Sequence, residues 1–142
     1  GETDLIIKKE AESIPISRQE KDSIIEGIRN IILAGGRTIP DEVLEQGCQF
    51  PAARPHFVSL VTDERGRLYV RRLRSVLDES DMQILDVFGP DGRYLYRIVT
   101  DVAPLVIRGG LVYELEENRD EATILLKRHR ILNWDSVKGG TT

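Results

Sequence analysis

The feature that most constrains the fold is a series of short strand-like runs, rich in Val, Ile, Leu and Tyr, that are separated by tight turns containing glycine. Turns of this kind lie at residues 63–66, 89–92 and 109–110. Strands joined by such short turns can only pair with each other in antiparallel fashion. The sequence therefore predicts antiparallel hairpins, with strands at 56–62, 67–73, 82–88, 93–99, 105–108, 111–116 and 122–131 and a charged loop at 117–121.

A single long helix is predicted ahead of this strand region. Ser17 and Glu20 have the spacing of a capping box, in which each side chain accepts a hydrogen bond from a free backbone N–H at the helix start. Gly35 and Gly36 then mark the helix end. The apolar positions between these signals recur at helical spacing and form one stripe, consisting of Ile24, Ile25, Ile28, Ile31 and Ile32.

The isoleucine stripe has two interpretations. Isoleucine is a weak helix former, so packing must stabilise this helix. The stripe either covers the sheet of its own chain as core, or it is an interaction surface for a partner, in which case the contacting residues are Ile24, Ile28, Ile31 and Ile32.

These patterns divide the chain into consecutive segments. We expect an extended arm or strand at 1–16, a helical segment at 17–47 with a second short helix from Pro40, an antiparallel β region at 48–134 and a flexible tail at 135–142. A length of 142 residues is near the commonest domain size, so we expect one domain overall. The predicted fold class is mainly β with an N-terminal α-helix.

The strand region also contains a weak internal repeat. A strand, a glycine turn and Leu68-Tyr69-Val70 match a strand, a Gly-Gly turn and Leu111-Val112-Tyr113, with an offset of 44 residues between Tyr69 and Tyr113. A repeat of this length with four short strands in each unit is typical of one blade of a β-propeller.

Two hairpins in this region resemble those of the six-bladed β-propeller proteins of the NHL-like kind. The first is Val-Thr-Asp-Glu-Arg-Gly-Arg-Leu-Tyr-Val at 61–70, which is similar to the family pattern D-x-x-G-x-L-Y-V. The second is Leu-Asp-Val-Phe-Gly-Pro-Asp-Gly-Arg-Tyr-Leu at 85–95, which is similar to V-F-D-P-D-G-R-Y-L, with Gly89 in place of an Asp. The resemblance covers residues 56–131, or a little under two blades, and it implies antiparallel meander sheets that resemble blades.

Two blades cannot close a propeller ring, because propellers contain four to eight blades. One alternative is that the chain is the C-terminal end of a propeller, with residues 5–10 left from the preceding blade. The other is a small stand-alone relative, whose exposed sheet edges are covered by its helix or by a second copy. Because repeat units need several neighbours for stability, we expect self-association into a homo-oligomer.

The sequence contains no recognisable catalytic, cofactor or metal motif. Cys48, His56 and His129 lack the paired spacing of a zinc site. The acidic stretches at 78–81 and 114–121 lack the EF-hand pattern, and no nucleophile motif or phosphate-binding loop is present. The net charge of −4, with Arg and Lys mixed among acids, argues against nucleic acid, and no apolar run is long enough to span a bilayer.

We therefore expect a non-catalytic scaffold or protein-interaction module, whose partner is a second copy or another protein. The resemblance also implies carbohydrate as a partner, and it favours a bacterial extracytoplasmic location, in the periplasm or secreted. Two alternatives stay open. One is a C-terminal fragment of a β-propeller hydrolase or lactonase, and the other is a small-ligand or carbohydrate-binding domain with its groove between helix and sheet.

Overall fold

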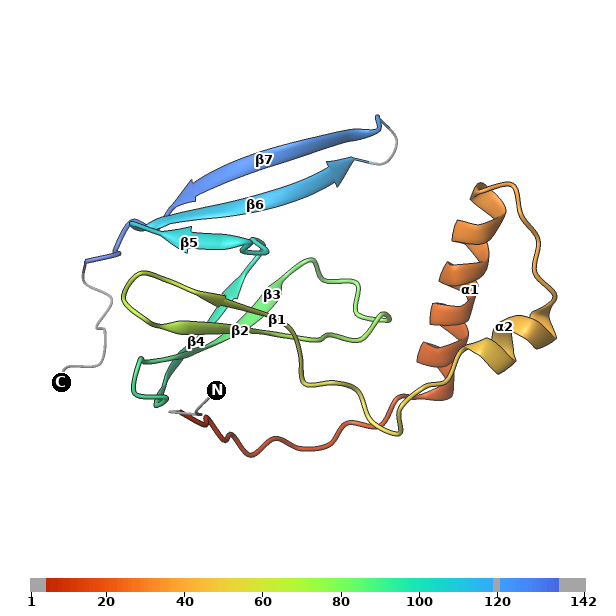
Figure 1. Ribbon diagram of the computed structural model, residues 1–142, viewed down its shortest axis with the longest axis horizontal. Helices are drawn as coiled ribbons and strands as arrows, with labels where there is room; N and C mark the ends of the chain where they lie inside the picture. The colour runs from red at the N-terminus through yellow and green to blue at the C-terminus, as the bar shows by residue number, and fades with distance from the viewer. Residues whose placement is uncertain (1–4, 119–120, 136–142) are drawn as a thin grey trace. The chain divides into compact units, whose positions relative to one another are not determined.

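The computed structural model describes residues 5–118 and 121–135, and it confirms a mainly β fold preceded by helices (Figure 1). These residues form two compact units, the first containing 5–9, 57–72, 81–118 and 121–135 and the second containing 10–56 and 73–80. The elements are α1 (Arg18–Ala34), α2 (Asp41–Gly47), β1 (Phe57–Thr62), β2 (Leu68–Arg72), β3 (Gln83–Phe88), β4 (Tyr94–Thr100), β5 (Val106–Arg108), β6 (Leu111–Asn118) and β7 (Thr123–Arg130).

In the first unit, the strands β1, β2, β3 and β4 form an antiparallel meander in that order. The central strand β3 has four consecutive buried residues, from Leu85 to Phe88. Alternate residues of a strand point to opposite faces, so a run of buried residues shows that both faces of β3 are covered. The predicted hairpin turns at 63–66 and 89–92 connect these strands.

The strands β5, β6 and β7 form a second antiparallel meander in the same unit. The charged loop predicted at 117–121 is wrong at its start, because β6 continues to Asn118, which pairs with Thr123. Its charged residues gave a loop-like composition, but cross-strand pairing with β7 keeps them in the sheet.

The core of the first unit lies between the two sheets. Tyr69 and Val87 from the four-stranded sheet and Ile107 from the three-stranded sheet are buried together. Half-buried apolar side chains surround them, from Val61, Leu95, Tyr96, Ile98, Val112, Ile131 and Trp134. The two sheets therefore stabilise each other by burying one face each.

The second unit contains both helices and two loop segments. Helix α1 begins with the predicted capping box, in which the Ser17 hydroxyl accepts from the Glu20 N–H (3.2 Å) and Glu20 accepts from the Ser17 N–H (3.0 Å). The Glu20 side chain is buried and also accepts hydrogen bonds from Arg54 and Ser75. The hydrogen bond from Ser75, with those from Ser17 and the charge of Arg54, lowers the pKa of Glu20 to about 2.

The N-terminal arm belongs to the first unit up to Lys9 and contains no strand in the described residues from Leu5 onward. Its residues Leu5 and Ile7 lie against Gly92 in the turn between β3 and β4. Neither helix in the described part of the chain combines the length and apolar character needed to cross a bilayer. The tail predicted at 135–142 lies outside the described residues apart from Asp135.

Candidate functional site

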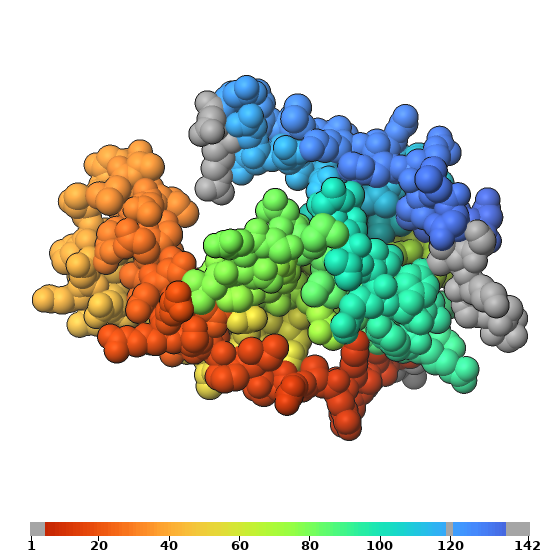
Figure 2. Space-filling view, turned by 180° about the vertical axis from the view of Figure 1, so that it is seen from behind, coloured from red at the N-terminus to blue at the C-terminus, as the bar shows by residue number. Residues whose placement is uncertain are grey.

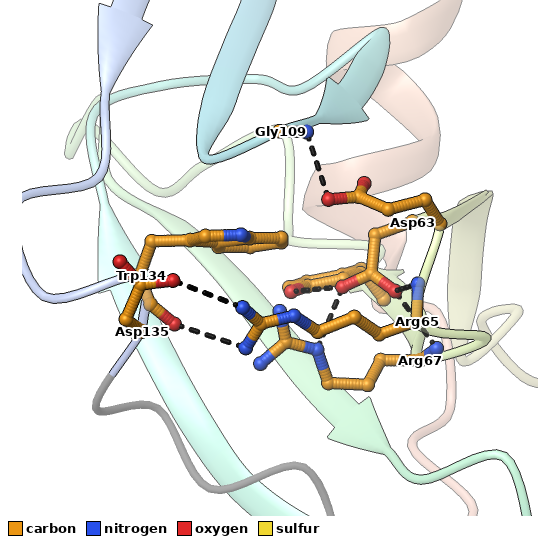
Figure 3. Close-up of polar contacts among 8 residues, drawn as sticks. Asp63, Arg65, Arg67, Gly109, Trp134 and Asp135 are labelled. Atoms are coloured by element: carbon orange, nitrogen blue, oxygen red, sulfur yellow. Dashed lines mark hydrogen bonds and ion pairs between the residues drawn. The ribbon is translucent and has the colours of Figure 1, made fainter.

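A network of hydrogen bonds on Asp63 organises the turn between β1 and β2 (Figure 3). One carboxylate oxygen accepts from the backbone N–H groups of Arg65 (2.9 Å) and Arg67 (3.0 Å). The other accepts from Nε of Arg67 (2.6 Å) and from the hydroxyl of Tyr69 (3.0 Å). Asp63 and Arg67 have fully buried side chains, so this is an ion pair inside the protein.

Trp134 covers this ion pair from the C-terminal side of β7. Its ring centroid lies 4.3 Å from Cζ of Arg67 and 4.8 Å from Cζ of Arg65. Arg65 also donates hydrogen bonds to the Trp134 carbonyl and to Asp135, both at 3.2 Å. Gly110 has φ +72° and approaches the Trp134 side chain so closely that a β-carbon there would lie 2.9 Å from it. Glycine at this position therefore permits the stacked arrangement seen in Figure 3.

A cleft of about 370 Å³ lies between the two sheets of the first unit, beside this network. Its floor and walls are mostly apolar, and the side chains of Tyr69, Tyr96 and Trp134 give it an aromatic side. Burial raises the pKa of Tyr96, with Asp63 adding to that shift and Arg67 opposing it. The cleft is large enough for a small organic molecule.

A second buried charge, Asp86 on β3, lies on the other face of the four-stranded sheet. Its carboxylate accepts hydrogen bonds from Lys9 (2.8 Å), Arg72 (2.8 Å) and Arg97 (3.1 Å). Burial alone would raise the pKa of Asp86, but these three cations together lower it to about 2. This cluster attaches the N-terminal arm to the sheet, and its donors account for both carboxylate oxygens, so we interpret it as structural.

One face of the three-stranded sheet is partly covered, where it borders the cleft, and the opposite face is open. Ile107, Val112 and His129 are cross-strand partners and line the cleft. Because side chains alternate along a strand, the residues between them form the opposite face, which we call the outer face: Val106, Arg108, Tyr113, Leu115, Glu117, Ile124, Leu126 and Arg128. Leu115, Ile124 and Leu126 on this face are 53%, 72% and 65% exposed.

Strand β7 is also the edge of its sheet in the described part of the chain, since it pairs only with β6. Seven of its eight residues are exposed. In Figure 2 the blue residues of β7 lie at the surface along one border of the first unit. An exposed, partly apolar edge of this length presents unpaired backbone groups and is a template for pairing with another strand.

The residues predicted as an interaction surface lie on α1 in the second unit. Ile24, Ile28 and Ile32 are half-buried there, and Ile31 is 64% exposed. Their role as a contact surface stays a prediction, as does the domain organisation predicted from the sequence.

The residues considered for a metal site do not form one in the described residues. His129 pairs with Glu114 at 3.1 Å, and Cys48 is a half-buried free thiol. No group of three or more His, Cys, Asp or Glu side chains within the described ranges is arranged to hold a metal ion.

The Asp63–Arg67–Trp134 network was not predicted from the sequence. The turn at residues 63–66 was predicted correctly, but no role was expected for its charged side chains. One signal was available: Arg67 and Tyr69 are two residues apart and must share a face of the strand, so a charged residue beside a core tyrosine indicated a buried ion pair.

Comparisons with known proteins gave no matching family model, no matching curated protein and no matching solved structure. The functional conclusions therefore depend on the site geometry alone.

Proposed function

We propose that the chain is a non-catalytic protein-interaction module that binds an extended segment of a partner protein along the open edge of β7. The observation that supports this best is the exposure of β7, which is an edge strand with two alternate leucine or isoleucine side chains in water. In strand addition, backbone hydrogen bonds at a sheet edge provide affinity and alternate side chains provide specificity.

The neighbouring sheet supports the proposal by its strand order. The strands β1, β2 and β3 form the same antiparallel meander as β5, β6 and β7, and the first meander continues into β4. The strand β4 covers the edge of β3, whereas no strand covers the edge of β7 in the part of the chain described. An added strand beside β7 would occupy the position that β4 occupies beside β3.

The side chains of the outer face define the partner's chemistry. Ile124 and Leu126 require apolar neighbours on the added strand. Two residues further on, the face becomes basic at Arg128 on β7, which no ion pair within the described residues involves. Arg130 on β7 and Arg108 on β5 continue the basic character in the next cross-strand row of that face. The partner segment should therefore carry an acidic residue opposite Arg128 and apolar residues at the next two alternate positions.

Synthetic seven-residue peptides test this proposal directly. The first has the sequence Thr-Glu-Ser-Val-Thr-Val-Ser, which places an acid and two valines on one face of a strand. One control replaces its Glu by Lys, and the other places the two valines side by side so that they fall on opposite faces. By fluorescence anisotropy of labelled peptide, we expect the first to bind about fivefold more tightly than the Lys control, since one surface charge pair is worth up to about 1 kcal/mol. It should also bind more tightly than the second control, in which one valine no longer faces Ile124 or Leu126.

Matched protein variants separate the edge from general electrostatics. Arg128→Glu should weaken binding of the Glu-containing peptide and strengthen binding of the Lys control. Added salt should reduce both effects. Arg93→Glu makes the same charge change in the exposed turn between β3 and β4 and should change neither affinity.

Two outcomes would contradict the assignment. Equal affinity for all three peptides would show that β7 does not discriminate between peptides by their side chains. Light scattering that shows a concentration-dependent dimer, dissociated by Leu126→Asp, would assign the edge to a second copy of the chain instead.

A further inference from the structure

The cleft between the two sheets does not include Ile124, Leu126 or Arg128, the β7 side chains proposed to contact a partner, although His129 and Arg130 of β7 line it. Its apolar wall comes mainly from Leu85 and Ile98 on one sheet and Ile107 and Val112 on the other. A cavity of about 370 Å³ with this lining is suited to the apolar body of a small molecule.

Arg67 gives the cleft a second property. Its side chain is completely buried, and although Nε is bonded to Asp63, neither Nη1 nor Nη2 has a partner of full hydrogen-bond geometry. Buried guanidinium donors almost always find acceptors, because an unmade hydrogen bond from a charged group is costly. Together with Nε of Arg71, these two donors are the buried side-chain nitrogens without a partner of full hydrogen-bond geometry in the described part of this unit.

The position of Arg67 places these donors behind one wall of the cleft. Its guanidinium lies 4.3 Å from the ring of Trp134 and 6.0 Å from the ring of Tyr69. Burial raises the pKa of Tyr96, whereas the charge of Arg67 and donation from it lower that pKa. All three aromatic residues line the cleft, and Arg67 itself does not. A molecule in the cleft therefore reaches the donors only when the Trp134 side chain moves aside, and this movement is part of the proposal below.

The geometry of the donors specifies the chemistry of the acceptor. Two terminal guanidinium nitrogens form a planar fork that matches a carboxylate in bidentate fashion. Apolar and aromatic walls match an aromatic or hydrocarbon body. We propose that the cleft binds a small amphipathic carboxylate, whose aromatic or alkyl part fills the space between the sheets and whose carboxylate accepts hydrogen bonds from Nη1 and Nη2 of Arg67 once the Trp134 side chain has moved aside.

The fluorescence of Trp134 reports on this site without a label, because it is the only tryptophan in the sequence. The whole chain is titrated with 4-phenylbutyrate at constant ionic strength, and in parallel with 4-phenylbutyramide, which has the same body without the charge. We expect a saturable change in Trp134 emission with the acid and at least tenfold weaker binding of the amide. The acid should also raise the midpoint of thermal unfolding, since it binds only the folded protein.

Three variants are compared, so that the result does not depend on whether any single variant folds. Arg67→Lys retains the positive charge but loses the two parallel guanidinium donors. It should weaken binding of 4-phenylbutyrate at least tenfold without changing the affinity for 4-phenylbutyramide. Because Arg67→Lys could destabilise the turn, Val112→Phe provides a second route by filling the cleft from β6, and it should abolish binding of both compounds. Val99→Phe makes the same enlargement on β4, on the face of the four-stranded sheet away from the cleft, where the residue is 57% exposed, and it should bind both compounds like the unmodified protein.

Several results would overturn the proposal. Equal affinity for acid and amide would show that Arg67 takes no part. An emission change and thermal shift reproduced by inorganic phosphate or chloride would show that the donors hold a simple ion. If Trp134 emission shows no saturable change up to about 10 mM compound, which corresponds to a binding free energy weaker than about 3 kcal/mol, the cleft binds no such molecule. None of these results bears on the peptide binding proposed for β7.

Discussion

The two sheets of the first unit have the same order of strands and opposite exposures. The strand β3, third in its sheet, has four consecutive buried residues, whereas β7, third in the other sheet, has seven exposed residues out of eight. The difference does not come from apolar content, because the Ile-Leu-Leu of β7 is as apolar as any part of β3. It comes from coverage: β3 has a strand on each side and both faces covered, whereas β7 has a strand on one side only and, apart from His129, exposed side chains on both faces. Burial is thus set by a strand's neighbours as much as by its own sequence.

The largest expected effect comes from breaking one ion pair in each sheet and comparing the losses in the free energy of unfolding. Asp63→Ala removes the partner of a fully buried Arg67 and should lower the free energy of unfolding by about 3–5 kcal/mol. Glu116→Ala breaks the ion pair with Lys127 in the three-stranded sheet, where both side chains are more than two-fifths exposed, and should cost less than about 1 kcal/mol. Urea denaturation of both variants measures the contrast, and similar losses would show that the two sheets differ less in burial than the structure indicates.

A second comparison uses leucines. Leu85 on β3 is 4% exposed, so Leu85→Ala should leave a cavity and cost about 2–5 kcal/mol. Leu126 on β7 is 65% exposed, so Leu126→Ala should change stability by no more than about 0.5 kcal/mol. The same denaturation experiment applies. A large loss in Leu126→Ala would mean that the outer face is already covered in solution, as it would be in an oligomer.

A smaller effect is expected in the dependence of stability on pH under acidic conditions. The pKa of Asp86 is lowered from an ordinary 3.8 to about 2 in the folded protein, so the folded state favours the ionised carboxylate. Its contribution, about 2 kcal/mol, is present in full above the unfolded pKa of about 4 and is lost as the pH falls through 2. Asp86→Asn should therefore flatten the dependence of stability on pH between about 4 and 2, measured by urea denaturation at each pH. Asp91→Asn, in the exposed turn after β3, should leave that dependence in place.

Local patterns allowed much of the fold to be predicted. The capping box of Ser17 and Glu20 and the glycine turns are interactions between residues a few positions apart, and the strand periods follow from the backbone itself. The end of β6 was missed because Glu117 and Asn118 have a loop-like composition, and only their pairing with β7 keeps them in the sheet. The propeller resemblance, self-association and the role of the isoleucine stripe stay predictions.

The candidate sites depend on contacts that are distant in sequence, which explains why less of them was predicted. Arg65 and Trp134 are 69 residues apart, and no periodic pattern links them. Lys9 and Asp86 are 77 residues apart. The open edge of β7 could be expected only in general, from the statement that two blade-like units leave edges uncovered. Its identity required the strand order.

The division of the chain into two units has a consequence for dissecting the protein. The first unit is built from an arm before Glu10 and from strands after His56, and the loop at 73–80, which belongs to the second unit, interrupts it again between β2 and β3. Each unit is therefore discontinuous along the chain, and no single cut releases either one whole. Removal of residues 1–56 would take away Lys9 from Asp86, and it would also leave Ser75 without the carboxylate of Glu20. Truncation should thus damage both units at once.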